Sequence, residues 1–283
     1  MGAQASFLPD GRRLHLHHGP IDLIIGATGA GREAAFKAAA ARFDTVLEEL
    51  VVELEMLRQS VADPNPFQGE IARLMHAAVA PLSEVFITPM AAVAGSVSDT
   101  ILAALRTAGG LQTAYVNNGG DVAMWLAPGT QMTAAIAAGL PDRVTLTPDM
   151  GIGGIATSGW RGRSLSFGIA DGVTVLARTA VAADAAATLI ANAVDLPGNA
   201  KIKRLPACDL APDSDLGMRL ITVDVAPLTA SEIAQALKNG AIYARLIQNR
   251  GLIHAALLTL NDQRQIVGTP DFFSPTPKEL HHA

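Results

Sequence analysis

The chain has 283 residues, of which 49% are hydrophobic and 17% charged, so it can bury a sizeable core and is not a disordered segment. Its net charge is −5 and no run rich in Lys or Arg occurs, which argues against a nucleic-acid partner. No window of about 18 or more apolar residues is uninterrupted, so we expect no membrane span.

Two further features bear on the compartment. Residues 1–19 lack the apolar core of a signal peptide. Cys208 is the single cysteine and cannot form an internal disulfide, which suits a reducing environment. We therefore expect a cytoplasmic protein, and the sequence leaves a homo-oligomer open.

The N-terminal region predicts two strands and two helices. Polar and apolar residues alternate over 13–17, and a more apolar strand follows at 21–25. Apolar residues at helical spacing predict one long helix over 32–58, and a second helix over 68–80. His15, His17 and His18 cluster near the N-terminus, where a metal site is one interpretation, although no carboxylate partner is evident nearby.

A glycine-rich segment, Gly26 to Gly31, lies between the second strand and the long helix. Such a turn can hold phosphate at a helix N-terminus, and it resembles a dinucleotide-binding turn. Its spacing is G-x-x-G-x-G, however, and no second strand ending in an acid follows about 20 residues on. The alternative is a flexible connection, and a Rossmann-type oxidoreductase is the third hypothesis for function.

The rest of the chain alternates short strands with blocks of helix. Helices are predicted over 91–108, 182–194 and 231–238. Strands are predicted over 85–88, 114–117, 122–126, 133–137, 144–146, 155–158, 165–169, 173–177, 221–225 and 255–260. Residues 197–216 are expected to be irregular. Consecutive strands with turns favour an α+β fold with a largely antiparallel mixed sheet and packed helices. We expect a single domain over 1–283, with a loose tail over 270–283.

Two glycine-containing segments are candidate binding sites. Asn118-Gly119-Gly120-Asp121 separates two predicted strands, and its glycines would let a ligand approach the backbone while the carboxylate accepts a hydrogen bond. An ordinary tight hairpin turn explains the same pattern. Thr157-Ser158-Gly159 follows a short apolar strand, and its amides and hydroxyls suit a phosphate or a flavin ring. A bulged loop of small residues is the alternative there.

A third candidate pairs Asp184 with Thr188, which lie four residues apart and therefore on one helix face. A carboxylate and a hydroxyl in this arrangement can hold Mg²⁺, with phosphate as a further ligand. The alternative is that Asp184 caps a helix and Thr188 is packed.

Taken in order, these segments resemble the ApbE superfamily of flavin transferases. The GGD turn at Gly119, the Thr157-Ser158-Gly159 strand end and the A-D-x-x-x-T pattern from Ala183 to Thr188 are similar to its motifs. Ala94-Gly95 through Asp99 is similar to the family's K-G-x-x-x-D helix. The resemblance implies T-fold-like halves, binding of FAD or FMN with Mg²⁺, and transfer of FMN to a protein threonine.

Two departures separate this chain from the family. Ala94 stands where the family has Lys, and the segment that resembles H-x-x-D-P, residues 163–171, contains no His. Asp171 is a partial substitute, but a proton-transferring imidazole is absent from that place. Two hypotheses follow. The first is an enzyme that cleaves, transfers or reduces a flavin nucleotide. The second is a carrier or regulator that only binds one.

Overall fold

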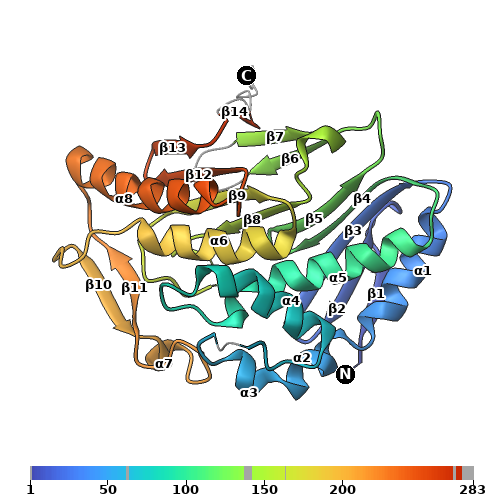
Figure 1. The fold of residues 1–283 in the computed structure, drawn as a ribbon, viewed down its shortest axis with the longest axis horizontal. Coiled ribbons are helices and arrows are strands. Elements are labelled where there is room, and N and C mark those ends of the chain that lie inside the picture. The colour runs from blue at the N-terminus through green and yellow to red at the C-terminus, as the bar shows by residue number, and fades with distance from the viewer. Residues whose placement is uncertain (1, 62–63, 137–141, 163, 270–271, 276–283) are drawn as a thin grey trace.

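The computed structural model describes all residues except 1, 62–63, 137–141, 163, 270–271 and 276–283. Nine strands form one sheet in the order β1-β2-β3-β4-β5-β8-β9-β12-β13, and every neighbouring pair is antiparallel (Figure 1). The bounds of these strands are β1 Gln4–Phe7, β2 Leu14–His18, β3 Ile21–Gly29, β4 Leu111–Asn118, β5 Asp121–Leu126, β8 Gly154–Ser158, β9 Gly172–Ala177, β12 Ala255–Leu260 and β13 Gln263–Val267.

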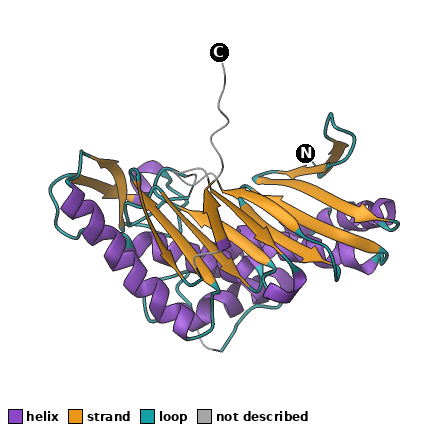
Figure 2. Ribbon diagram, turned by 90° about the horizontal axis from the view of Figure 1, so that it is seen from above, coloured by secondary structure: helices purple, strands orange, loops and turns teal. Residues whose placement is uncertain are grey.

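The main helices cover one face of this sheet, as Figure 2 shows. Alternate side chains of the strands, such as Leu23, Ile25 and Val116, point to that face and are fully buried. The helices are α1 Arg32–Phe43, α2 Val46–Val52, α3 Leu54–Leu57, α4 Glu70–Val79, α5 Val93–Thr107, α6 Ala180–Ala193, α7 Ala207–Leu210 and α8 Ala230–Asn249. The expected α+β class with a largely antiparallel sheet is confirmed.

The large sheet consists of two halves with the same arrangement. In the N-terminal half, β2 and β3 are followed by helices α1 to α5 and then by β4 and β5. In the C-terminal half, β8 and β9 are followed by α6 to α8, with a small hairpin among them, and then by β12 and β13. Strands β5 and β8 join the halves. This is the two-fold repetition that T-fold-like halves imply.

Two smaller sheets complete the molecule. One of them contains three strands, β6 Met132–Ile136, β7 Asp142–Leu146 and β14 Phe273–Pro275. It forms a second apolar cluster with the large sheet, in which Leu146 and Phe273 are buried together with Leu176 of β9 and Leu257 of β12. Strands β10 Ile202–Pro206 and β11 Leu220–Val225 form a separate hairpin that flanks α7. Residues 273–275 of the expected loose tail thus form a strand, whereas 270–271 and 276–283 lie outside the described residues.

The single helix predicted over 32–58 is wrong, because the chain forms three short helices there. Helix α1 ends at Phe43 and α2 at Val52. Glu53 interrupts the pattern: its carboxylate accepts the backbone N–H groups of Gln68 and Gly69 at 2.8 and 2.9 Å, at the start of α4. The apolar spacing persists across the breaks because each piece packs on the same core.

The dinucleotide-turn interpretation of Gly26 to Gly31 is also wrong. Gly26 and Gly29 lie within β3 and pair with Tyr115 and Leu111 of β4. A Cβ at Gly31 would lie 1.9 Å from the carbonyl oxygen of Gly109, so glycine is needed for the close contact of two turns. Since β3 is antiparallel to both of its neighbours, no βαβ unit exists at this place.

Other differences concern short segments. Residues 85–88 and 165–169 are not strands, and the expected irregular region 197–216 contains β10 and α7. Helix α8 continues well beyond residue 238, and strands β1 and β13 were not predicted because their residues are largely exposed and polar. Residue 137 of the predicted strand 133–137 lies outside the described residues.

Candidate functional site

The β4–β5 hairpin positions the first candidate residues. Its two-residue turn consists of Gly119 and Gly120, whose φ angles of 65° and 115° lie in the region that favours glycine. Asn117 Oδ1 accepts the N–H of Gly120 at 2.8 Å, and Asn118 Nδ2 donates to the carbonyl of Ala94 at 3.3 Å. Asp121 therefore begins β5 directly beside the N-terminus of α5.

The Thr-Ser-Gly segment lies next to this hairpin because β8 pairs with β5. The backbone N–H of Thr157 donates to Asp121 Oδ1 at 3.3 Å, and the hydroxyl of Thr157 contacts that of Thr174 at 2.8 Å. A Cβ at Gly159 would lie 2.6 Å from the carbonyl oxygen of Asp171, so no side chain fits there. Two segments far apart in sequence thus meet around one carboxylate.

Helices α5 and α6 meet at their N-termini near the centre of the molecule and run in opposite directions (Figure 1). Asp99 of α5 accepts the N–H groups of Ala180 and Val181, at 3.1 and 2.8 Å. Asp184 of α6 in turn accepts the N–H of Gly95 at 2.9 Å. Each helix therefore caps the other, and both carboxylates sit in the positive field of a helix N-terminus.

The environment of Asp184 disfavours its charged form. Desolvation raises its pKa well above the usual value, and the negative charge of Asp121 raises it further, while the N–H groups of Gly95 and Ala94 act in the opposite direction. Desolvation likewise raises the pKa of Asp99 to about 6, against the N–H groups of Val181 and Ala180. The N-cap of α6 itself is Thr179, so Asp184 caps the neighbouring helix rather than its own.

Two cavities adjoin at Asp121. The smaller has a volume of about 240 Å³ and is lined by Asp121, Asp184 and Thr188. The larger, of about 860 Å³, is lined by Asn118, Gly119, Asp121, Thr157, Ser158 and Gly159 on one side and by apolar residues of α2 and α3 on the other. Both are lined by Met90, Val93, Ala94, Asp121 and Ser164. The larger cavity has a size that is typical of small-molecule sites.

Gly120 lines neither of these two cavities. It lines a third cavity of about 800 Å³, together with Thr157, Ser158 and Gly159. The sequence reasoning also missed several residues that line the smaller cavity, namely Phe86, Thr88, Phe167, Asn192 and Asp215. No local motif marks them, because they come from loops and from the far end of α6.

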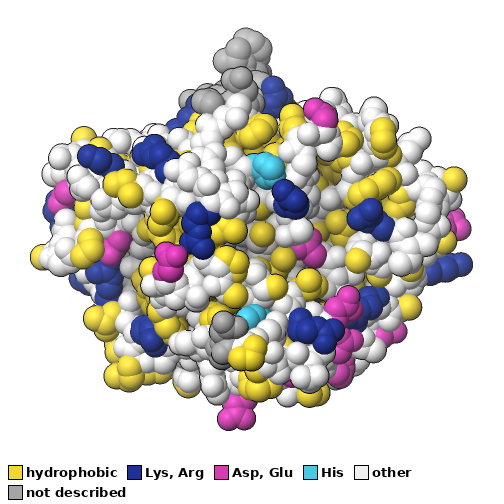
Figure 3. All heavy atoms as spheres, viewed as in Figure 1, with side chains coloured by type: hydrophobic (Ala, Val, Ile, Leu, Met, Phe, Trp, Pro, Cys, Tyr) yellow, Lys and Arg dark blue, Asp and Glu magenta, His cyan; other side chains and the backbone are white. Residues whose placement is uncertain are grey.

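The N-terminal histidines do not assemble a metal site. His15 Nε2 lies 3.0 Å from Asp22 Oδ1, whereas His18 faces the opposite side of β2 and is buried. Within the described part of the chain, no group of three or more His, Cys, Asp or Glu side chains could hold a metal ion. Lys and Arg are scattered over the face in Figure 3 rather than gathered into one patch. No described helix is long and apolar enough to cross a membrane.

A family model described as "AbpE bacteria" matches residues 5–266. The chain belongs to this family. It is 38% identical over 129 residues to a UPF0280 protein of Methanothrix thermoacetophila, a match that covers 44% of this chain and 52% of the relative. It is 40% identical over 116 residues to a UPF0280 protein of Methanothermobacter thermautotrophicus, covering 39% and 44%. The chain spans about half the length of these curated relatives.

The fold of the family is also found among solved structures. An ApbE protein of Thermotoga maritima covers 95% of this chain and 98% of its own, with a TM-score of 0.51 and 12% identity. A flavinyl transferase ApbE of Pseudomonas stutzeri in its apo form covers 95% and 94%, with a TM-score of 0.45 and 14% identity. The similarity to the Thermotoga protein supports the α+β fold described above.

Proposed function

We propose that the protein binds a flavin nucleotide together with Mg²⁺ at the two adjoining cavities. The observation that carries the proposal is the position of Asp121, which lines both cavities and contacts both glycine-containing segments. The family and its fold are consistent with this ligand.

The larger cavity suits the flavin ring. Leu47, Leu50, Leu54 and Leu57 give it an apolar wall, and the opposite wall has the small or polar residues Gly119, Thr157 and Ser158. A planar ring can pack on the leucines while its polar edge accepts and donates hydrogen bonds on the other side. Gly119 and Gly159, which both line this cavity, keep the backbone accessible to the ligand.

The smaller cavity suits a phosphate group that is balanced by a cation. Asp121, Asp184 and Asp215 line it, and no Lys or Arg is among the described residues of its lining. The donor set is composed of oxygen atoms, which Mg²⁺ prefers, and a cation would relieve the desolvated charge of Asp184. Asp184 and Thr188 would hold the metal, which when bound polarises a phosphate oxygen.

The N-terminus of α5 contributes to phosphate binding. Its N-cap residue, Ala92, provides no side-chain acceptor, and Val93 and Ala94 line both cavities. Backbone N–H groups at a helix N-terminus favour anions. The N–H groups of Gly95 and Ala94 donate to Asp184, and that of Val93 donates to the carbonyl of Met90, so this helix end would attract a phosphate through its dipole rather than through a free N–H.

A specific observation favours the second candidate function, a binding protein without transferase activity. Asp171, the partial substitute for the absent His, is already engaged. Its Oδ1 accepts from Arg161 Nε at 2.9 Å, and its Oδ2 accepts the N–H of Asn261 at 2.5 Å. It lines the third cavity rather than the two that meet at Asp121.

The experiment is titration of FAD and FMN, with and without Mg²⁺, against wild type and Asp184→Asn. Asparagine keeps an oxygen that can accept the Gly95 N–H but removes the charge. We expect the variant to bind FAD about tenfold or more weakly and to lose the Mg²⁺ dependence. Asp99→Asn is the matched control, because Asp99 is also a helix cap but lines neither cavity. It should retain the Mg²⁺ dependence.

Equal FAD affinity in wild type and Asp184→Asn, whatever the metal, would reduce Asp184 to a helix cap. The absence of any FAD and FMN binding to wild type would remove the proposed function altogether. Chromatography of FAD after incubation with the protein and Mg²⁺ separates the two candidate functions. Cleavage or transfer of FMN supports the enzyme, whereas intact FAD supports the binding protein.

A further inference from the structure

Thr88 is a buried threonine at the wall of the smaller cavity, and its hydroxyl does not serve the helix that follows it. The residue is 2% exposed and directly precedes η2, the 3-10 helix Pro89–Ala92. A threonine at such an N-cap usually accepts a backbone N–H with its side chain, but Thr88 makes no such bond. Its hydroxyl instead donates to Oδ2 of Asp215, and its Oγ1 accepts no hydrogen bond from the residues that the structure describes. The oxygen therefore keeps its lone pairs for another partner.

The carboxylate of Asp215 lines the same cavity and is engaged by this hydroxyl alone among the described residues. Its Oδ1 accepts no hydrogen bond there, and no described Lys, Arg or His forms an ion pair with it. Asp171 differs in this respect, because both of its oxygens are engaged. Thr88 and Asp215 thus form a hydroxyl–carboxylate pair in which the carboxylate is free to take up a proton.

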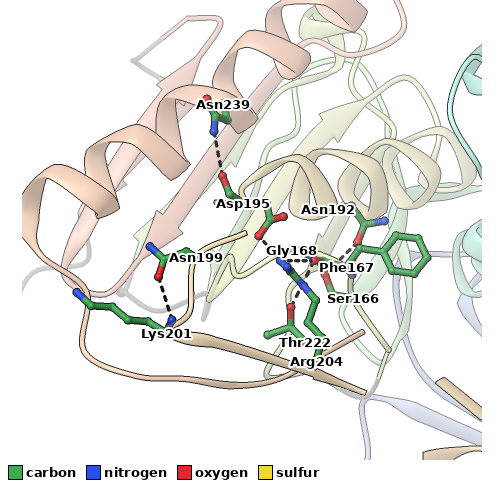
Figure 4. A network of polar contacts seen from close by, with 10 residues as sticks. All are labelled: Ser166, Phe167, Gly168, Asn192, Asp195, Asn199, Lys201, Arg204, Thr222 and Asn239. Carbon is green, nitrogen blue, oxygen red and sulfur yellow. Dashed lines mark hydrogen bonds and ion pairs between the residues drawn. The ribbon is translucent and has the colours of Figure 1, made fainter. Parts of the chain in front are cut away.

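The loop that carries Asp215 connects β10 to β11, and both of these strands are tied to the cavity wall. Arg204 of β10 donates from Nη2 to the carbonyl oxygen of Phe167 at 3.3 Å (Figure 4). The hydroxyl of Thr222 in β11 donates to the same oxygen at 3.3 Å, and Phe167 itself lines the cavity. The carboxylate is therefore held against Thr88 before any ligand arrives, which lowers the entropic cost of bringing the two groups together.

The pair shares its cavity with the proposed site for phosphate and Mg²⁺. Asp184 and Thr188 line this cavity too, and its volume of about 240 Å³ leaves little distance between a phosphate held there and the Thr88 hydroxyl. Transfer of a phosphoryl group to a hydroxyl needs an oxygen nucleophile near the phosphorus, a cation that balances charge and an acceptor for the hydroxyl proton. A carboxylate is sufficient as that acceptor, as the catalytic aspartate of protein kinases shows. No imidazole is therefore required at this place.

We propose that Thr88 is a modification site, to which the protein attaches FMN from bound FAD with Asp215 as the general base. The proposal rests on the proposed function, since FAD and Mg²⁺ would have to bind at the adjoining cavities. Thr88 Oγ1 forms a bond to the phosphorus of the FMN half, and the bond from that phosphorus to the oxygen bridging the two phosphates breaks. The bridging oxygen leaves with the electron pair as part of AMP, and the hydroxyl proton passes to Asp215 Oδ2.

The two cavities decide which half of FAD is kept and which group attacks it. In the proposed function the apolar wall of the larger cavity holds the flavin ring, so FMN is the half that stays and AMP is the half that leaves. Burial of Thr88 places its hydroxyl, rather than bulk water, beside the phosphorus. Because the acceptor belongs to the chain itself, the reaction occurs once per chain and leaves a protein that carries its flavin covalently.

The experiment incubates the full chain with FAD and Mg²⁺, unfolds it, removes free flavin and measures the intact mass and the flavin absorbance that remain. We expect the added mass of one FMN group per chain, located at Thr88 by fragmentation of proteolytic peptides. Thr88→Val keeps the shape of the side chain without the hydroxyl and should carry no flavin, whereas Thr88→Ser should still be modified. Asp215→Asn can accept the hydrogen bond but cannot take up the proton, so it should slow attachment by about 100-fold or more.

Thr100→Val is the matched control, because Thr100 is also buried and donates its hydroxyl, to the carbonyl of Ser96 at 2.8 Å, but lines neither cavity. It should be modified at the wild-type rate. Titration of FAD against Thr88→Val gives a readout that does not depend on the reaction, and its affinity should stay within about twofold of wild type. Should Thr88→Val fail to fold, the peptide mapping and the rate of Asp215→Asn still decide.

The outcomes separate this proposal from the proposed function. Wild type that binds FAD with Mg²⁺ but acquires no covalent flavin overturns the modification site and leaves the proposed function standing. Flavin attached at another residue, AMP attached in its place, or attachment that persists in Thr88→Val overturns the site as well, and a wild-type rate in Asp215→Asn overturns the role of the base. If wild type binds neither FMN nor FAD, the proposed function fails and the modification site fails with it.

Discussion

The N-termini of α5 and α6 lie side by side, yet they are completed in different ways. The N-terminus of α6 has two side-chain acceptors: Thr179 accepts the N–H of Ala182, and Asp99 accepts those of Ala180 and Val181. The end of α5 begins at an alanine without a capping side chain, and Asp184 is its only side-chain acceptor among the described residues.

This difference assigns separate roles to two similar helix ends. The α6 end is capped by Thr179 and Asp99, which line neither cavity, whereas the α5 end is capped by Asp184, which lines the smaller cavity. Asp184 therefore has two roles, since it caps α5 and also lines the smaller cavity. The variants below test whether the α6 end is purely structural and the α5 end is shared with the ligand.

The largest expected effect follows from Gly95→Ala. Alanine normally stabilises a helix by up to about 1 kcal/mol relative to glycine. Here a Cβ would lie 2.4 Å from the carbonyl oxygen of Ala180, so backbone must move where the two helix ends meet. We expect a loss of about 3 kcal/mol in the free energy of unfolding, measured by urea denaturation.

Gly2→Ala is the control for this change, because a Cβ at Gly2 meets no atom within 4 Å. It should leave the denaturation midpoint unchanged. Stabilisation by Gly95→Ala would mean that the two helix ends are not in close contact in solution.

A smaller effect is expected from the pH dependence of the metal-free protein. The pKa of Asp99 is raised to about 6 and that of Asp184 is raised as well, so the folded protein holds protons that the unfolded chain releases near pH 4. Stability should therefore fall as pH rises from about 4 through 6. Asp184→Asn should remove part of this fall and stabilise the metal-free protein at pH 7 by on the order of 1 kcal/mol, or a few degrees in Tm.

Thermal melts between pH 4 and pH 8, in chelator, measure this effect. The difference between wild type and Asp184→Asn should shrink toward pH 4, where the wild-type carboxylate is protonated. A lower Tm for the variant at pH 7 would show that the charged carboxylate stabilises α5 more than its desolvation costs.

The smallest effect is expected from Thr179→Ala, which removes one of the two acceptors at the start of α6. Asp99 remains, so we expect a loss of only about 0.5–1 kcal/mol in the free energy of unfolding. FAD affinity should stay within about twofold, because Thr179 lines neither cavity. A marked loss of FAD affinity in Thr179→Ala would contradict the assignment of this helix end to architecture alone.

Much of the fold could be predicted from local patterns in the sequence. The alternation around Asn118 to Asp121 and the two glycines between the strands are sufficient to predict the β4–β5 hairpin. The alanine-rich stretch that became α6 was recognised within two residues at its N-terminus. Local patterns failed where a contact with a distant residue determines the backbone conformation. Glu53, for example, lies between two helices and its carboxylate accepts the backbone N–H of Gln68.

The candidate site was predictable in part for the same reason. Asp121, Asp184 and Thr188 follow from short motifs, but their arrangement depends on pairings between residues 81 to 89 positions apart, such as Gly95 with Asp184. Phe86 was assigned to a strand because its segment is apolar, and in the structure it lines a cavity from a loop. No local motif marks Asn192, because its orientation at the cavity wall is set by a hydrogen bond from Ser166 in a distant loop.

The reciprocal caps between α5 and α6 also constrain how the protein reaches its native state. Asp99 lies on α5, in the N-terminal half, and accepts from Ala180 and Val181 in the C-terminal half. Conversely, Asp184 lies on α6, in the C-terminal half, and accepts from Gly95 in the N-terminal half. Docking of the two helices supplies the only described side-chain acceptor for the start of α5 and a second one, beside Thr179, for the start of α6, so the two halves are expected to fold as one cooperative unit. A chain interrupted between β5 and β8 would therefore leave α5 without Asp184 and α6 with Thr179 alone, and it would lack the shared helix ends on which the cavities are built.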